Sequence, residues 1–140
     1  MFYLDTSVVV SALSVETRTH DVLRWLNEQS DSEFAVSDWV VTEVSSALSI
    51  KIRTGTINTA QRALILSQFA QLLTDTFRVL PIEQSAFRTA ARFCDQSQLK
   101  LRSGDALHLA ICAEHGATIC TLDQVLGQAA PVLGVASILV

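Results

Sequence analysis

The chain has 140 residues, of which 49% are hydrophobic and 17% charged, and its formal net charge is −4 at pH 7. The length suits one domain, expected over residues 1–140, and the composition excludes an intrinsically disordered or collagen-like chain. The negative charge by itself argues against a nucleic-acid-binding protein, because affinity for phosphate backbones usually comes from an excess of lysine and arginine.

Short apolar runs along the chain predict strands, and amphipathic runs between them predict helices. In chain order, we expect a strand at Phe2–Leu4, a helix at Thr19–Glu28, a strand at Phe34–Val36, helices at Trp39–Ile52 and Ala60–Phe77, a strand at Arg78–Ile82, helices at Ala86–Phe93 and Asp105–His115, and strands at Thr118–Leu122 and Ser137–Val140. Apolar strands that alternate with helices are typical of a parallel sheet covered on both faces. The sequence therefore predicts an α/β fold with a central parallel sheet of about five strands.

The N-terminus, the cysteines and the longest apolar stretch argue against export. Residues 1–5 contain no basic segment before the first acid, unlike a signal peptide. Cys94, Cys112 and Cys120 form no C-x-x-C pair, which is typical of reduced thiols rather than of disulfides or a zinc site. The apolar residues 129–140 are too few to span a bilayer. We therefore expect a cytoplasmic protein without membrane association.

Four acidic residues fall near the expected carboxyl ends of the strands. Asp5 ends the first strand, and Asp123 ends the fourth. Glu43 lies about one turn into the helix after the second strand, and Asp105 lies in the first turn of the helix before the fourth. Because the carboxyl ends of parallel strands share one edge, where ligands bind, we expect these four side chains to converge.

Such a convergence of carboxylates is unfavourable unless a cation offsets it. Two carboxylates about 5 Å apart repel by roughly 3 kcal/mol at an effective dielectric constant near 20. Four of them would therefore threaten a fold whose total stability is about 5–15 kcal/mol. The predicted ligands are all oxygen atoms, which suit Mg²⁺ or Mn²⁺ better than zinc or copper.

Each acid also has a purely structural interpretation. Asp5 could start a turn, Asp105 could complement a helix dipole, and Asp123 could cap the next helix. Glu43 is harder to explain in this way, because it shares the apolar stripe of its helix, where an unpaired charge is expensive. The joint position of the four at one sheet edge favours the functional interpretation.

Hydroxyl and imidazole groups accompany these acids along the sequence. Thr6, Ser7 and Thr121 lie next to them, and their hydroxyls could orient a carboxylate or simply cap a helix. His108 and His115 are seven residues apart on one predicted helix. For both histidines we expect a solvated or hydrogen-bonded side chain rather than a metal ligand.

Four segments carry a resemblance to a known family. They are Y-L-D-T-S at residues 3–7, the glutamate at position 43, L-R-S-G-D-A-L-H-L-A at residues 101–110 and T-L-D at residues 121–123. In order and spacing they resemble the PIN-domain ribonucleases, specifically the VapC-type toxins of VapBC toxin–antitoxin pairs. The resemblance spans the whole chain, and the ten-residue stretch is its most specific part. It implies a five-stranded parallel sheet and a Mg²⁺- or Mn²⁺-dependent endonuclease that cleaves RNA with a metal-activated water.

The resemblance also implies roles for individual residues. The family's acidic quartet corresponds to Asp5, Glu43, Asp105 and Asp123. Asp5 and Asp105 would be direct metal ligands, and Thr121 would supply the hydroxyl of the T-x-D element. Many members have a further acidic or amide residue close after the last aspartate. Here Gln124 and Val125 follow, so the sequence leaves open whether one or two metal ions bind.

Two protein partners follow from the same resemblance. Members are held by a small antitoxin, whose peptide covers an apolar groove and brings a basic side chain to the acidic cleft, and they commonly form homodimers. On the helix predicted at Ala60–Phe77, Ile65 and Leu66 broaden the apolar face toward such contacts, although ordinary core packing also explains them. Setting the acidic quartet aside leaves 10 acidic against 10 basic residues, so the net charge no longer argues against an RNA substrate.

Other functions fit the same residues less well. A phosphoacceptor receiver domain has adjacent acids after its first strand and a lysine after its last, whereas Asp5 stands alone and Ser137–Val140 contains no lysine. A haloacid-dehalogenase-type phosphatase needs an acid where Ser7 stands. A PIN-like binding module without catalytic activity remains an alternative, and the intact acidic quartet argues against it.

Overall fold

The computed structural model describes residues 1–140 and contains one five-stranded sheet in which every pair of neighbouring strands is parallel. Its strands are β1 (Phe2–Leu4), β2 (Phe34–Ser37), β3 (Arg78–Leu80), β4 (Thr118–Thr121) and β5 (Ser137–Leu139). Their order across the sheet is β3-β2-β1-β4-β5. The predicted parallel α/β fold is confirmed, and all of the predicted strands are present with small differences at their ends.

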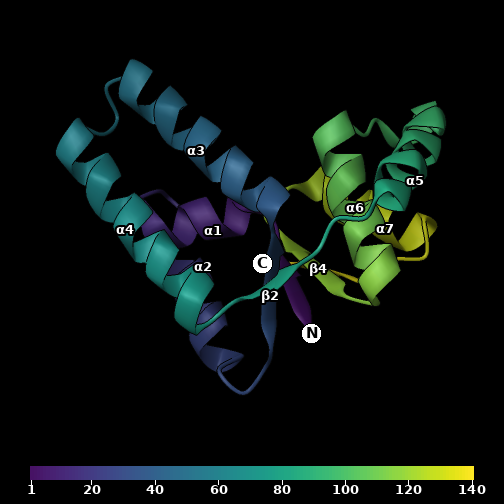
Figure 1. The fold of residues 1–140 in the computed structure, drawn as a ribbon, viewed down its shortest axis with the longest axis horizontal. Helices are drawn as coiled ribbons and strands as arrows, with labels where there is room; N and C mark the ends of the chain where they lie inside the picture. The colour runs from purple at the N-terminus through teal and green to yellow at the C-terminus, as the bar shows by residue number, and fades with distance from the viewer.

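Helices cover both faces of this sheet. They are α1 (Thr6–Leu13), α2 (Thr19–Glu28), α3 (Asp38–Arg53), α4 (Thr59–Asp75), α5 (Gln84–Asp95), α6 (Ser103–His115) and α7 (Gln124–Val132), with a 3₁₀ turn, η1, at Ser97–Leu99. Figure 1 shows α1 to α4 on one side of the sheet and α5 to α7 on the other. None of the helices has the length and apolar character that crossing a membrane requires.

The central strands are buried on both faces. Tyr3 and Leu4 of β1, together with Ile119 and Cys120 of β4, are at most 1% exposed. This double burial explains why the strands are continuous apolar runs without the polar alternation of a half-exposed sheet. Residues 106–112 of α6 are likewise all buried, because α6 lies between β4 and α5.

Two helices, α1 and α7, are absent from the sequence-based predictions. Helix α1 contains the run Val8–Val10, and β-branched residues favour strands over helices. Helix α7 contains Pro131 near its end, which weakens the helical pattern. Both helices begin with an aspartate cap, since Asp5 accepts from a backbone N–H of α1 and Asp123 from two of α7. Packing of α1 against α2 and α3, and of α7 against β4 and β5, overrides the weak local preference.

The apolar face of helix α4 is narrower than the sequence-based expectation of an interaction surface at Ile65 and Leu66. Ile65 is buried in the core and Leu66 is half-buried, so ordinary core packing explains both. The exposed large apolar residue of this helix is Leu64, which is 60% exposed.

The strand order fixes where a ligand site can form. From β1 the chain continues to β2 and β3 on one side of the sheet, and then returns to β4 and β5 on the other side of β1. The direction in which strands are added therefore reverses between β1 and β4. In open parallel sheets, the crevice beyond the carboxyl ends of the strands at such a point is the usual binding site. Leu4 and Cys120 are register partners, and therefore Asp5 and Thr121 emerge beside each other at this crevice.

Candidate active site

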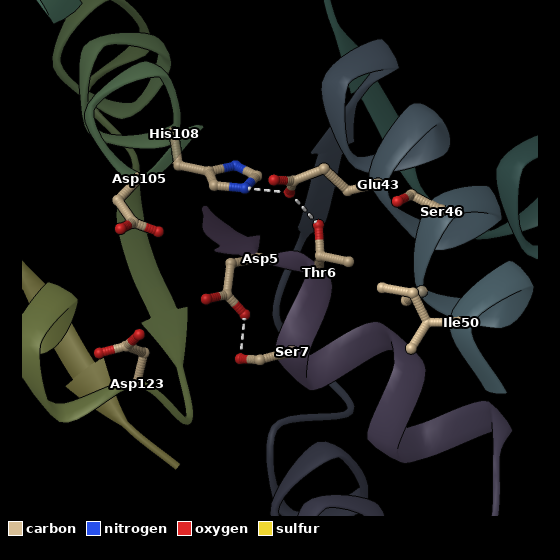
Figure 2. Close-up of a pocket in the computed structure, with 10 residues that line it drawn as sticks. Asp5, Thr6, Ser7, Glu43, Ser46, Ile50, Asp105, His108 and Asp123 are labelled. Carbon is tan, nitrogen blue, oxygen red and sulfur yellow. Dashed lines mark hydrogen bonds and ion pairs between the residues drawn. The ribbon is translucent and has the colours of Figure 1, made fainter. Parts of the chain in front are cut away.

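A pocket of about 290 Å³ lies at this crevice. It is lined by Asp5, Thr6, Ser7, Glu43, Ser46, Ala47, Ile50, Asp105, His108 and Asp123. The structure thus brings together the four carboxylates that are far apart in sequence, and Figure 2 shows them turned toward a common opening. The lining contains no lysine or arginine, so the pocket concentrates negative charge.

Asp5 is the most rigidly held of the four carboxylates. It is 4% exposed, and its Oδ1 accepts hydrogen bonds from Ser7 Oγ at 2.5 Å and from the backbone N–H of Val8 at 3.1 Å. Its Oδ2 accepts from Thr121 Oγ1 at 2.5 Å. Burial raises the pKa of Asp5 above its usual value, although the hydrogen bonds from Ser7 and Thr121 oppose the rise.

Glu43 is held by two side chains from other elements. Its Oε2 accepts hydrogen bonds from the Thr6 hydroxyl and from His108 Nε2, the latter at 2.6 Å. Burial alone would raise the pKa of Glu43, but the hydrogen bond and charge of His108, together with Thr6, lower it below its usual value. Oε1 of Glu43 accepts no hydrogen bond from the protein.

Asp105 and Asp123 each combine a structural role with a place in the pocket. Asp105 Oδ2 accepts from the backbone N–H of Arg102 at 3.2 Å, at the start of α6. Asp123 Oδ1 caps α7 by accepting two backbone N–H groups, at 2.7 and 3.1 Å. Burial raises the pKa of Asp105, and the negative charges of Asp123 and Glu43 raise it further. The hydrogen bond from Arg102 opposes this rise. The capping role expected for Asp123 is therefore present, and it leaves Oδ2 without a protein donor.

The donor set fits a hard divalent cation. Glu43 Oε1, Asp105 Oδ1 and Asp123 Oδ2 accept no hydrogen bond from the protein, so one oxygen of each of these three carboxylates is available. No group of three or more acidic, histidine or cysteine side chains is arranged to hold a metal ion by itself. Mg²⁺ typically takes only one or two carboxylates directly and keeps several water molecules, so it does not require such a preformed group.

The structure adds detail to the positions of Thr121 and His108. Thr121 is fully buried outside the pocket lining, and its hydroxyl acts on Asp5 rather than on the opening. His108 is hydrogen-bonded, as expected, but it also lines the pocket. The sequence contains an indication of this position, because a residue three positions after Asp105 lies on the same face of the helix. His115 lies away from the pocket and contacts the backbone oxygen of Pro81.

Comparisons with known proteins agree with this fold. The family model of the PIN domain matches residues 2–130. The crystal structure of FitAcB from Neisseria gonorrhoeae is similar with a TM-score of 0.76 and 19% sequence identity, covering 99% of this chain and 96% of that chain. VapBC2 from Rickettsia felis, bound to a DNA fragment from its promoter, gives a TM-score of 0.69 and 15% identity, covering 99% and 98%.

A third solved structure, PAE2754 from Pyrobaculum aerophilum, gives a TM-score of 0.63 and 17% identity, covering 97% of this chain and 89% of that chain. A search of curated protein sequences finds no match. At these identities the structural likeness shows the fold alone, whereas the family model covers most of the sequence. The resemblance noted in the sequence is therefore confirmed, and the chain belongs to the PIN-domain family.

Proposed function

We propose that this chain is a metal-dependent endoribonuclease that acts as the toxin of a type II toxin–antitoxin pair, with residues 1–140 working as one domain. PIN domains are a family of nucleases, and the chain belongs to them over residues 2–130. The observation that carries the proposal is the pocket in which four carboxylates from distant segments meet without a lysine or arginine. A receiver domain, in contrast, needs a lysine in its acidic pocket.

The residues that would hold Mg²⁺ or Mn²⁺ are Asp5 and Asp105, with Glu43 and Asp123 beside them. When bound, such a cation lowers the pKa of a coordinated water and stabilises negative charge on a phosphate group. The protein itself contributes orientation. Thr121 and Ser7 hold both oxygens of Asp5, so that this carboxylate keeps one direction in the pocket.

Support for an antitoxin partner comes from an apolar cavity and from the similar structures. The cavity has about 240 Å³, lies among α1, α2, α4 and the sheet, and includes Leu23, which is 48% exposed. An antitoxin segment with apolar side chains would cover it. VapBC2 is itself a complex bound to promoter DNA, which is the assembly expected of such a pair. We also propose a homodimer, supported by the exposed Phe87 of α5 beside Trp39 in a second, largely apolar groove.

The test is cleavage of total or transfer RNA by the purified chain without antitoxin. We expect cleavage with Mn²⁺, and loss of cleavage with a chelator or in Asp5→Asn. His115→Asn is the matched control, because His115 lies outside the pocket, and it should cleave like the unchanged protein. Cleavage that continues in the chelator and in Asp5→Asn would refute the proposed mechanism. No cleavage of any RNA under these conditions would favour an inactive PIN-like binding module.

A further inference from the structure

A chain of hydrogen bonds leads from the interior of the sheet to the acidic pocket. The Tyr3 hydroxyl lies 2.8 Å from Ser37 Oγ and 2.9 Å from His108 Nδ1. At the other end of the imidazole ring, His108 Nε2 lies 2.6 Å from Glu43 Oε2, an oxygen that Thr6 also contacts. Figure 2 shows this last part, with the His108 ring turned toward Glu43. Glu43, on α3, is therefore linked through α6 to side chains of β1 and β2.

The chemistry of the two ends fixes the direction of these hydrogen bonds. An ionised carboxylate only accepts hydrogen bonds, so His108 Nε2 must donate to Glu43. Burial raises the pKa of Tyr3 well above its usual value, so the phenol keeps its proton and can serve the other ring nitrogen. Contacts at both nitrogens hold the rotation of the ring, as they do for histidines that orient metal sites.

The fold alone does not require a polar group at this position. His108 is 3% exposed, and its neighbours on residues 106–112 of α6 are apolar or cysteine. Replacing a buried polar pair by well-packed apolar residues is often neutral or stabilising. The polar link therefore points to a role at the pocket, and its single contact with a pocket carboxylate is Glu43.

Gly104 lies close to the other oxygen of the same carboxylate. A Cβ atom at position 104 would lie only 3.0 Å from Glu43 Oε1 and 3.5 Å from the indole Nε1 of Trp39. The missing side chain leaves room for the oxygen that accepts no hydrogen bond from the protein. One oxygen of Glu43 is thus held and the other is left free.

We infer that His108 is a positioning residue, which holds Glu43 Oε2 so that Oε1 is free to serve a divalent cation in the pocket. This inference rests on the proposed function for the presence of the metal. It predicts that metal affinity depends on a donor at the position of Nε2 rather than on an imidazole as such.

Mn²⁺ affinity of the full chain, measured by paramagnetic resonance titration, tests this role. In His108→Asn the shorter amide does not reach Glu43, and we expect affinity to fall about 10–100-fold, the usual effect of losing a residue that orients a metal ligand. In His108→Gln the amide reaches as far as Nε2, and most of the affinity should return. His115→Asn, on the same helix, should bind like the unchanged chain. Unchanged affinity in His108→Asn would overturn the inference.

A double-mutant cycle with Glu43→Gln separates positioning from other effects. If His108 acts through Glu43, adding His108→Asn to Glu43→Gln causes no further loss of Mn²⁺ affinity. A full additional loss would show that His108 acts by another route and would overturn the inference. Should His108→Asn fail to fold, Tyr3→Phe tests the hold on the ring, because it keeps the donor at Nε2 while removing the partner at Nδ1. We expect a smaller loss of Mn²⁺ affinity in this variant, and unchanged affinity would overturn the role of the hydrogen-bond chain.

Nitrogen-15 NMR of the metal-free chain supplies a readout that does not depend on metal or activity. We expect one signal set for His108 with a proton on Nε2, because Glu43 Oε2 accepts from this nitrogen. Mixed tautomers in an unchanged chain that binds Mn²⁺ would overturn the positioning role alone. An unchanged chain that binds no Mn²⁺ would instead overturn the proposed function, and with it the metal part of this inference.

Discussion

The Asp5 carboxylate accepts a 2.5 Å hydrogen bond from the hydroxyl of Thr121, a residue 116 positions further along the chain. The parallel pairing of β1 with β4 makes this contact possible, since Leu4 and Cys120 are register partners. The same hydroxyl oxygen accepts from the backbone N–H of Asp123 at 2.9 Å. One buried side chain thus orients two of the pocket's acidic residues.

Thr121→Val should therefore weaken metal binding without changing any charge. Valine fills the same volume but removes the donor to Asp5 and the acceptor for the Asp123 backbone. We expect Mn²⁺ affinity to fall about 10-fold or more, as for other residues that orient metal ligands. Thr121→Ser keeps the hydroxyl and is the matched control. Equal Mn²⁺ titration curves for the valine and serine variants would contradict this role.

Asp105→Asn should stabilise the metal-free protein and destabilise the metal-bound one relative to the unchanged chain. Burial and the charges of Asp123 and Glu43 disfavour the ionised form of Asp105, and an asparagine oxygen can still accept from Arg102. We expect a gain of roughly 0.5–1 kcal/mol in chelator, the scale of a partly screened charge interaction. With saturating Mn²⁺ the unchanged chain should instead be the more stable of the two, because Asp105→Asn lacks a carboxylate that binds the metal.

Thermal unfolding followed by differential scanning fluorimetry measures both states. A gain of this size corresponds to about 1–4 °C in Tm for a domain of this length. Asp75→Asn, on the exposed end of α4, is a control that removes one acidic charge far from the pocket. A Tm of Asp105→Asn below that of the unchanged chain in chelator would contradict the repulsion between carboxylates that the structure indicates.

Metal affinity should decrease as the pH falls, beginning above the range where ordinary aspartates titrate. The pKa values of Asp5 and Asp105 are both raised by burial, so protons compete with the cation at higher pH than they do at an exposed carboxylate. Mn²⁺ titrations from pH 8 to pH 5 should show this loss, and Asp105→Asn should flatten it. Constant affinity down to about pH 4 would contradict the raised pKa values.

The same pKa shifts have the opposite effect on the metal-free fold. A folded-state pKa above the unfolded value means that the native state binds protons more tightly, so stability increases as the pH falls through the raised pKa. For Asp5 and Asp105 this gain is complete below their unfolded pKa near 3.8. Glu43 acts in the other direction, because its lowered pKa gives stability that is lost only below its usual value of 4.5. Chelator-treated protein should therefore become more stable on mild acidification, as urea unfolding at several pH values would show.

Gly104→Ala should reduce Mn²⁺ affinity while leaving the helix intact. Alanine is the better helix former, by roughly 0.5–1 kcal/mol, so α6 itself should not weaken. Its Cβ would nevertheless press on Glu43 Oε1 at 3.0 Å and displace it. Gly127→Ala in α7 is the matched control, because there a Cβ would meet only ordinary contacts at 3.5 and 3.6 Å. Unchanged Mn²⁺ affinity in Gly104→Ala would show that Glu43 adjusts without consequence.

The sheet and the acidic residues were predictable because their signals are local. Fully buried strands such as Phe2–Leu4 are short apolar runs, and an acid directly after such a run lies at the carboxyl edge wherever the strand sits. Helix α1 was not predictable in this way, because its run Val8–Val10 favours a strand and only packing against other helices decides otherwise.

The partners of the site residues depend on tertiary structure and leave no local signal. The contact of His108 with Tyr3 joins positions 105 apart, and its contact with Glu43 joins positions 65 apart. The sequence indicated that Glu43 needs a partner, but not which side chain supplies it. Similarly, the hydroxyl of Thr121 was expected at the site, whereas its burial beneath Asp5 follows from the register of β1 and β4.

The pairing of β1 with β4 also has a consequence for biosynthesis. The Asp5 carboxylate and the hydroxyl that holds its Oδ2 are 116 positions apart, so a ribosome adds Thr121, and then Asp123, long after it has added Asp5. A chain that stops before position 121 therefore cannot assemble the acidic pocket. For a protein proposed to cleave RNA of its own host, this late completion of the pocket would keep such incomplete chains inactive.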